Sequence, residues 1–132
     1  MIKLVGVKKK LGGQPVLQGV DLTIPPGKLT TIIGRSGEGK SVLLKHMIGL
    51  LQPDEGEILL DGENLLNLSE DEMTKVRGNR ISMIFQQPQT SLNPVFRVGE
   101  QIGEVLNIHQ DFGKEAAQKR TIELLKLVGI PD

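Results

Sequence analysis

The sequence predicts an α/β domain with an antiparallel β subregion near its start. Two observations support this fold class. The first third of the chain alternates apolar and polar residues between turn signals such as Gly12-Gly13 and Pro25-Pro26, which is typical of half-buried strands. From Lys40 onward apolar residues recur at helical spacing, and short apolar runs separate the helical segments. Strands followed by alternating helices and strands indicate an α/β arrangement.

Five segments are predicted strands, and two of them have the composition of a buried sheet. Ile81–Phe85 is a continuous apolar run, of the kind that is buried on both faces of a parallel sheet. Leu29–Ile33 is a β-branched run that leads straight into Gly34. The predicted strands are Ile2–Val7, Val16–Ile24, Leu29–Ile33, Glu57–Leu60 and Ile81–Phe85.

Four segments are predicted helices. The second opens on Ser69-Glu70-Asp71-Glu72, a capping box in which the Ser and Glu side chains each bind an exposed amide of the helix start. The fourth is followed by Gly129 and Pro131, which are helix-stop signals. The predicted helices begin near Lys40, at Ser69, near Val98 and near Lys114, and they end before 52–56, at about Arg77, after Leu106 and at Gly129.

The composition argues against several classes of function. Sixteen basic residues balance sixteen acidic ones, so no global positive field favours nucleic acid or anionic lipid. The absence of cysteine removes disulfides, thiolate metal sites and thiol nucleophiles. Three phenylalanines are the only aromatic residues, so stacking platforms for single-stranded nucleic acid are nearly absent. No segment has the apolar length of a signal peptide or a membrane span, so we expect a soluble domain that reaches membranes only through a partner.

The strongest motif is a phosphate-binding P-loop (Walker A) at Gly34-Arg35-Ser36-Gly37-Glu38-Gly39-Lys40-Ser41, which fits G-x-x-x-x-G-K-S/T without a mismatch. Its glycines let consecutive backbone amides point inward, and the following helix adds its positive N-terminal end. Lys40 supplies a cation for the β- and γ-phosphates, and the Ser41 hydroxyl is a hard oxygen ligand suited to Mg²⁺. The motif predicts binding of nucleotide phosphates, most simply those of ATP with Mg²⁺.

On these residues the chain resembles the nucleotide-binding domains of ABC transporters along essentially its whole length. Residues 16–65, VLQGVDLTIPPGKLTTIIGRSGEGKSVLLKHMIGLLQPDEGEILLDGENL, resemble the opening of such a domain. The stretch RISMIFQQPQTSLNPVFRVGEQI resembles the strand, Q-loop and start of the helical subdomain. The resemblance implies that Gln86 is the Q-loop glutamine, which contacts Mg²⁺ and the attacking water and couples to the membrane subunit. It further implies a cytoplasmic domain peripheral to the membrane.

Two parts of the chain resemble different ABC transporters. GRSGEGKSVLLKHMIGLL is similar to ATPases of bacterial lipid-trafficking (Mla-type) transporters, whereas ISMIFQQPQTSLNPVF through LLKLVGIPD is similar to ATPases of oligopeptide and dipeptide importers. A divergent natural protein, a reconstructed ancestor and a deliberate chimera are all compatible with this mixture.

Two positions of the nucleotide site depart from the family pattern. Leu11 stands where the family usually has an aromatic residue that stacks on adenine, and leucine offers apolar contact but no π face. Val42 stands where the family usually has threonine, so a hydroxyl near the α-phosphate is lost while the backbone amide remains.

Several motifs that the family uses for hydrolysis are missing from the sequence: the LSGGQ-type signature, the Walker B strand with its catalytic glutamate, and the switch histidine. Asp61 ends an apolar strand but is followed by Gly62, which indicates a turn, and His46 and His109 read as ordinary helix residues. Hydrolysis needs an oriented water and a base as well as a phosphate cradle. We therefore expect ATP–Mg²⁺ binding with little or no turnover.

The chain is interpreted as the N-terminal half of an ABC ATPase domain, that is, a P-loop NTPase half domain that ends in the start of a helical subdomain. Residues 1–85 would supply the β subregion, the P-loop and the core strands, and residues 86–132 the Q-loop and the partial helical subdomain. The sheet would then lack the strand beside Leu29–Ile33, which predicts self-association. The alternative is a standalone P-loop module, natural or engineered, that binds phosphate, polyphosphate or nucleic-acid backbone with little base selectivity.

Overall fold

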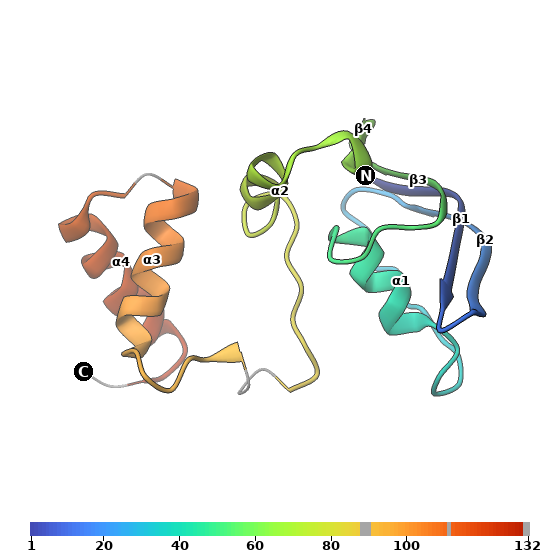
Figure 1. Ribbon diagram of the computed structural model, residues 1–132. Coiled ribbons are helices and arrows are strands. Elements are labelled where there is room, and N and C mark those ends of the chain that lie inside the picture. Colours follow the sequence, from blue (N-terminus) through green and yellow to red (C-terminus); the bar gives the residue numbers. More distant parts are fainter. Residues whose placement is uncertain (88–90, 111, 131–132) are drawn as a thin grey trace. The chain divides into compact units, whose positions relative to one another are not determined.

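The computed structural model describes residues 1–87, 91–110 and 112–130. The chain divides into two compact units, Met1–Arg77 and Gly78–Asp132, and each is described by itself. The first unit contains a four-stranded antiparallel sheet with strand order β2-β1-β3-β4 (Figure 1). Its strands are β1 (Ile2–Leu11), β2 (Gln14–Ile24), β3 (Glu55–Leu60) and β4 (Glu63–Asn64). The antiparallel β subregion expected from the sequence is thus confirmed.

The β1 strand carries a bulge that aligns its apolar residues. Leu4 and Val7 are three positions apart and both are buried, whereas a regular strand would turn them to opposite faces. The pairing register shifts between these two residues, and Gly6 there has φ of 58°. The amide of Gly6 donates to Asp21 Oδ1 at 2.8 Å, which satisfies a donor that the bulge would otherwise leave unpaired.

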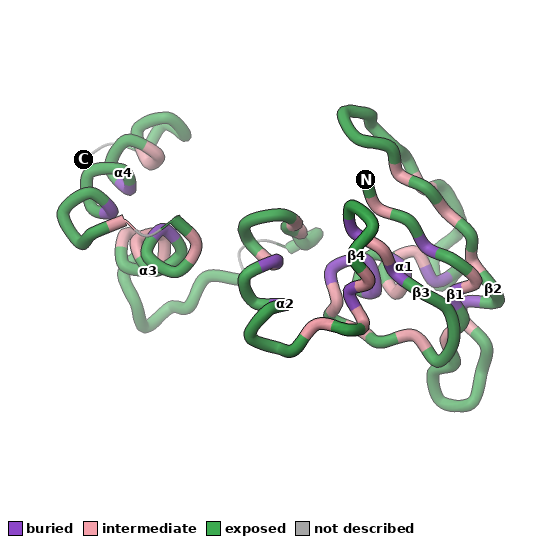
Figure 2. Tube along the Cα trace, turned by 90° about the horizontal axis from the view of Figure 1, so that it is seen from above, coloured by how far each residue is buried: buried purple, intermediate pink, exposed green. Residues whose placement is uncertain are grey.

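The core of the first unit lies between the sheet and its helices. Helix α1 (Lys40–Met47) runs beside the sheet, and α2 (Glu70–Val76) follows the short 3-10 turn η1 (Leu65–Asn67) (Figure 1). Figure 2 marks the buried positions in purple along α1 and the neighbouring strands. The buried apolar side chains of this unit are Leu4, Val7, Leu17, Leu43, Met47, Ile48, Ile58, Leu60, Leu65, Met73 and Val76.

The predicted capping box at the start of α2 is confirmed. Ser69 Oγ accepts from the Glu72 amide at 3.3 Å, and the Glu72 carboxylate accepts from the Ser69 amide at 2.8 Å. The bond from the Ser69 amide, together with one from the Ser69 hydroxyl, lowers the pKa of the Glu72 carboxyl below its ordinary value. The end of α2 is also fixed, because Arg77 Nε donates to Ile48 O at 3.1 Å and Arg77 Nη2 donates to Gly49 O at 2.8 Å. Arg77 thereby ties α2 to the carbonyls that follow α1.

The strand predictions for Leu29–Ile33 and Ile81–Phe85 were wrong for this structure. Residues 29–33 form no strand, and Leu29 and Ile33 are 96% and 90% exposed. In the second segment only Ile81 makes an isolated bridge, and Ile84 is 89% exposed. A strand of a parallel sheet forms only where a neighbouring strand completes its hydrogen-bond ladder, and no described strand pairs with either segment.

The second unit contains α3 (Val98–Gln110) and α4 (Lys114–Leu127), which pack against each other. Leu106, Ala117 and Thr121 are its buried side chains among the described residues. A loop from Asn93 to Phe96 leads into α3 and is held by Gln101, whose amide nitrogen donates to Asn93 O and Phe96 O, both at 3.0 Å. None of the helices in the described ranges has the length and apolar content needed to cross a membrane.

Candidate phosphate-binding site

The glycine-rich loop at Gly34–Ser41 leads directly into α1. Gly37 and Gly39 both have φ of 84°, a left-handed conformation that side chains with a Cβ rarely adopt. These two glycines turn the backbone so that α1 begins at Lys40, as the sequence predicts. The local fold therefore follows from the spacing of the glycines within the motif.

The first turn of α1 presents uncapped amides. The N-cap residue Gly39 provides no side-chain hydrogen bond, and no acidic residue occupies the first turn. The first intrahelical bond runs from the Leu43 amide to Gly39 O at 2.8 Å, so the amides of Lys40, Ser41 and Val42 precede it. Such amides and the positive end of the helix attract anions. This geometry fits the phosphates of a nucleotide.

Charged side chains of the loop are bound to the loop itself. Lys40 Nζ donates to Gly34 O at 2.6 Å and also to Arg35 O. The Glu38 carboxylate accepts from the Arg35 amide at 2.6 Å. Two of the loop's three charged side chains, Lys40 and Glu38, are thus bonded to backbone groups of the loop.

β2 forms one wall of the site. A Cβ placed on Gly39 would lie 3.0 Å from Val16 Cγ1 and 3.2 Å from Val16 O, so glycine is what allows the loop to approach the strand. A depression of about 230 Å³ lies beside the loop, with Val16, Leu17 and Lys40 among its lining residues. Sequence reasoning missed Val16, because nothing in its local pattern distinguishes it from other alternating residues of a strand.

Comparison with known proteins decides the family. The ABC transporter family matches residues 17–132 of the chain. The chain belongs to the ABC transporter family. It is 48% identical over 129 residues to the oligopeptide transport ATP-binding protein OppD of Bacillus subtilis (strain 168), covering 93% of this chain and 36% of that protein. It is 46% identical over 126 residues to the dipeptide transport ATP-binding protein DppD of Lactococcus lactis subsp. cremoris (strain MG1363), covering 92% of this chain and 36% of that protein.

Solved structures of ABC cassettes confirm the fold class. A dimeric, post-hydrolysis ATP-binding cassette bound to ADP and Pi has a TM-score of 0.82 and 34% identity, covering 96% of this chain and 56% of that one. A second dimeric structure of the same cassette, MJ0796, has a TM-score of 0.81 and 35% identity, with the same coverage. The fold is that of a P-loop NTPase half domain with an antiparallel β subregion and the start of a helical subdomain. The chain spans little more than a third of the length of the peptide-transport relatives.

Leu11 and Val42, the two departures from the ABC pattern, lie in different surroundings. Leu11 is 43% exposed at the end of β1, where it pairs with Gln14 across the hairpin, and it does not line the depression beside the P-loop. Val42 is half-buried in α1, and its carbonyl oxygen lies 2.7 Å from His46 Nδ1. His46 itself is completely buried, and its Nε2 has no hydrogen-bond partner among the described residues.

The two predicted Mg²⁺ ligands, Ser41 and Gln86, lie in different units. Gln86 is exposed and lies in the second unit, whereas Ser41 is exposed in the first turn of α1. Across the described ranges, no three His, Asp or Glu side chains gather as a metal site.

Asp61 lies in the turn after β3, with φ of 52°, and its carboxylate accepts from the N-terminal ammonium group. Its interpretation as a turn residue is therefore confirmed.

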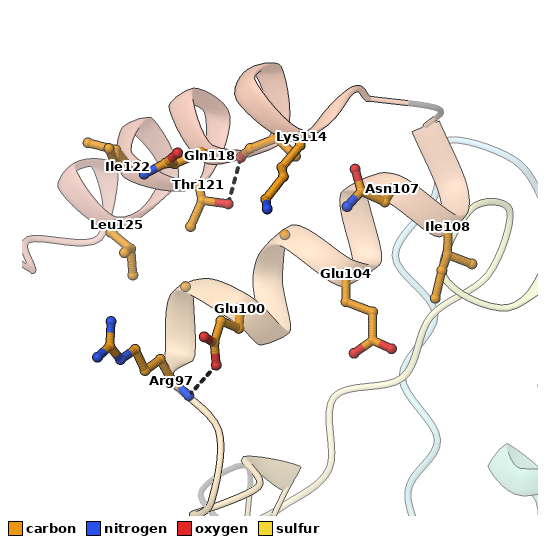
Figure 3. Close-up of a pocket in the computed structure, with 13 residues that line it drawn as sticks. Arg97, Glu100, Glu104, Asn107, Ile108, Lys114, Gln118, Thr121, Ile122 and Leu125 are labelled. Carbon is orange, nitrogen blue, oxygen red and sulfur yellow. Dashed lines mark hydrogen bonds between the residues drawn. The ribbon is translucent and has the colours of Figure 1, made fainter.

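A larger groove, of about 720 Å³, lies between α3 and α4 in the second unit (Figure 3). A Cβ placed on Gly99 or Gly103 of α3 would lie 3.8 or 3.9 Å from the Thr121 side chain of α4, an ordinary van der Waals contact, so the two helices lie close together here. Thr121 Oγ1 donates to Ala117 O at 2.8 Å, so its polar group is satisfied within α4. The groove contains none of the predicted site residues, and we assign it no function.

Proposed function

We propose that the chain binds ATP with Mg²⁺ through its P-loop, as the ATP-binding half of an ABC transporter ATPase subunit. The observation that carries the proposal is the uncapped start of α1 directly behind the glycine-rich loop, with no acidic residue in its first turn. The ABC family match supports ATP rather than an unrelated anion as the ligand. The named relatives are peptide-transport ATP-binding proteins, which favours a peptide importer as the parent system.

Each residue of the site has a role that follows from its chemistry. Backbone amides from Gly34 through Val42 would cradle the phosphates, and Lys40 would leave its loop carbonyls to pair with them. Bound Mg²⁺ neutralises phosphate charge. The hydroxyl of Ser41 and the side-chain oxygen of Gln86 are suitable hard ligands for it. Leu11 would provide only apolar contact to a base.

We infer binding with little or no hydrolysis by this chain alone, because Lys40 and Gln86 are only part of the machinery that hydrolysis needs. In the parent system the loop around Gln86 would contact the membrane subunit. We also propose self-association, since the exposed apolar segments around Leu29, Ile33 and Ile84 would be covered by a second copy. A strictly monomeric mass in solution, with those segments still exposed to hydrogen exchange, would refute the last point.

Calorimetric titration with Mg–ATP tests the proposal. We expect saturable binding by the native chain and loss of most of it in Lys40→Ala, whereas Lys45→Ala, in the last turn of the same helix, should bind like the native protein. Equal binding by the native chain and Lys40→Ala would contradict a P-loop site. If the native chain hydrolyses ATP at rates typical of intact ABC ATPases and Lys40→Ala does not, the inference of binding without hydrolysis is contradicted.

A second candidate function is a P-loop module that binds polyphosphate with little regard for the base. It is favoured by the position of Leu11, which does not line the depression beside the loop. Titration with ATP, GTP and inorganic triphosphate separates the two candidates. A clear preference for ATP supports the first, and equal affinities for all three ligands support the second.

A further inference from the structure

The side chain of Glu38 contacts the backbone of the P-loop that contains it. Its Oε2 accepts from the Arg35 amide at 2.6 Å, and a carboxylate acceptor makes such a bond charge-assisted. A Cβ placed on Gly34 would lie only 2.8 Å from the same oxygen. The carboxylate oxygen therefore occupies the space directly above Gly34, and the absence of a side chain at that position is what admits it.

The cation of the site is engaged in the same part of the loop. Lys40 Nζ donates to Gly34 O at 2.6 Å and to Arg35 O. The Cβ position of Gly34 also lies 3.7 Å from Lys40 Nζ, so the carboxylate and the ammonium flank the same glycine. In this state the loop satisfies its own donor and acceptor groups around Gly34 and Arg35.

A carboxylate oxygen and a phosphate oxygen offer a backbone amide the same chemistry, because both are anionic and accept hydrogen bonds. We propose that the Glu38 carboxylate is an internal competitor for the phosphate cradle: it takes the place of a ligand oxygen in the free loop and lowers the affinity for polyphosphates. The inference rests on the proposed function, since it concerns how the same site is regulated.

The competition has two parts. A ligand oxygen that approaches Gly34 must displace the carboxylate from the Arg35 amide. The displaced carboxylate then remains close to a highly charged ligand and repels it. Glu38 is exposed, so water softens both effects. An effect of about tenfold on affinity is the scale expected for one charge-assisted hydrogen bond near the surface.

The experiment compares the native chain with Glu38→Gln and Glu38→Ala, using Mg–ATP and inorganic triphosphate as probes in calorimetry. Gln keeps the length and an acceptor oxygen but loses the charge, whereas Ala loses both. We expect both probes to bind about tenfold more tightly to Glu38→Ala, with Glu38→Gln between it and the native chain. In the ligand-free protein, the Arg35 amide resonance should move upfield in Glu38→Ala as its strong acceptor is lost.

The outcomes separate this inference from the proposed function. If Lys40→Ala loses binding and the native chain binds as tightly as both Glu38 variants, the proposed competition by Glu38 is overturned while the P-loop site stands. An Arg35 amide that does not respond to Glu38→Ala would do so too, because the contact would then be absent in solution. Binding by Glu38→Ala but not by the native chain would support the competitor in its strongest form. No binding by any of the three proteins would overturn both.

Discussion

A pair of glycine substitutions measures how closely β2 constrains the P-loop. Gly37 and Gly39 have the same φ of 84°. A Cβ on Gly37 would meet nothing within 4 Å, whereas one on Gly39 would lie 3.0 Å from Val16 Cγ1 and 3.2 Å from Val16 O. Alanine at either position therefore has the same positive φ to adopt, and only Gly39→Ala adds a steric contact. The difference between the two variants isolates that contact.

The magnitudes follow from this geometry. Holding alanine in a left-handed conformation costs about 1–2 kcal/mol, and the lower entropy of the unfolded chain returns about 0.4–1 kcal/mol. Gly37→Ala should thus lower the free energy of unfolding by about 1 kcal/mol. Overpacking at Gly39 adds about 1–3 kcal/mol, because the carbonyl of Val16 belongs to the sheet and does not yield easily. Gly39→Ala should therefore be the less stable variant by that added amount.

Urea unfolding followed by NMR signals of β1 and β2 reports on the first unit by itself. Adding Val16→Ala to Gly39→Ala should recover part of the lost stability, because it removes the Cγ1 atom nearest to the new methyl group. Equal destabilisation by Gly37→Ala and Gly39→Ala would refute the reasoning. It would mean that β2 does not press against the loop in solution.

Three further predictions follow, two on α2 and its contact with the carbonyls after α1, and one on the contact between Asp54 and β1. Ser69→Ala should destabilise the first unit by about 1 kcal/mol through loss of the cap, while Ser69→Thr, which keeps the hydroxyl, should stay near the native value in urea unfolding. Arg77→Ala should lower the free energy of unfolding by about 2 kcal/mol, because two guanidinium bonds to the carbonyls after α1 are lost. Arg77→Lys should be only partly as stable as the native chain, since an ammonium group lacks the forked geometry of the guanidinium. Native stability of Arg77→Lys would argue against a role for that forked geometry. Asp54 binds Lys9 Nζ and the Lys10 amide, and these bonds, the Lys9 one first, hold the pKa of its carboxyl below the ordinary value of 3.8. The stabilisation by Asp54 is therefore complete at neutral pH and is lost as the pH falls through that lowered pKa. Asp54→Asn should be less stable than the native chain at pH 7, and the two should be equally stable well below the ordinary value of 3.8. A stability difference that persists in acid would contradict this assignment.

Elements whose determinants are local were predictable from the sequence. The hairpin of β1 and β2 follows from two alternating runs around Gly12-Gly13, and the structure extends both strands to Leu11 and Gln14. The capping box at Ser69 needs only four consecutive residues, and it forms with both expected bonds. The bulge at Gly6 was not predicted, because its signature is a register shift that appears only when the partner strand is present.

The two apolar runs show where local reasoning fails. Leu29–Ile33 and Ile81–Phe85 have the composition of buried parallel strands, yet no described strand pairs with them. Composition tells which residues tolerate burial in a sheet but does not provide the neighbouring strand. Leu29 and Ile33 are accordingly almost fully exposed.

The candidate site was likewise predictable only where its determinants are local in the sequence. The glycines, Lys40 and Ser41 were identified from spacing, because the phosphate cradle is built from consecutive backbone groups. The contact between Glu38 and the Arg35 amide was not, because the motif accepts any residue at position 38 and only the folded loop shows where its side chain turns. The role of Gln86 stays a prediction, as does that of Leu11.

The short helix that presents the phosphate cradle depends on contacts at both of its ends. α1 has eight residues, too few to be stable alone in water. Burial of Leu43 and Met47 holds its inner face, Gly39 lets its start lie against β2, and Arg77 binds the carbonyls just after it. All of these contacts come from residues 1–77. The contacts that hold α1 and the proposed phosphate cradle therefore lie within the first unit, and a loss of stability at Arg77 or Gly39 should weaken the proposed phosphate binding without any change to the loop's charged groups.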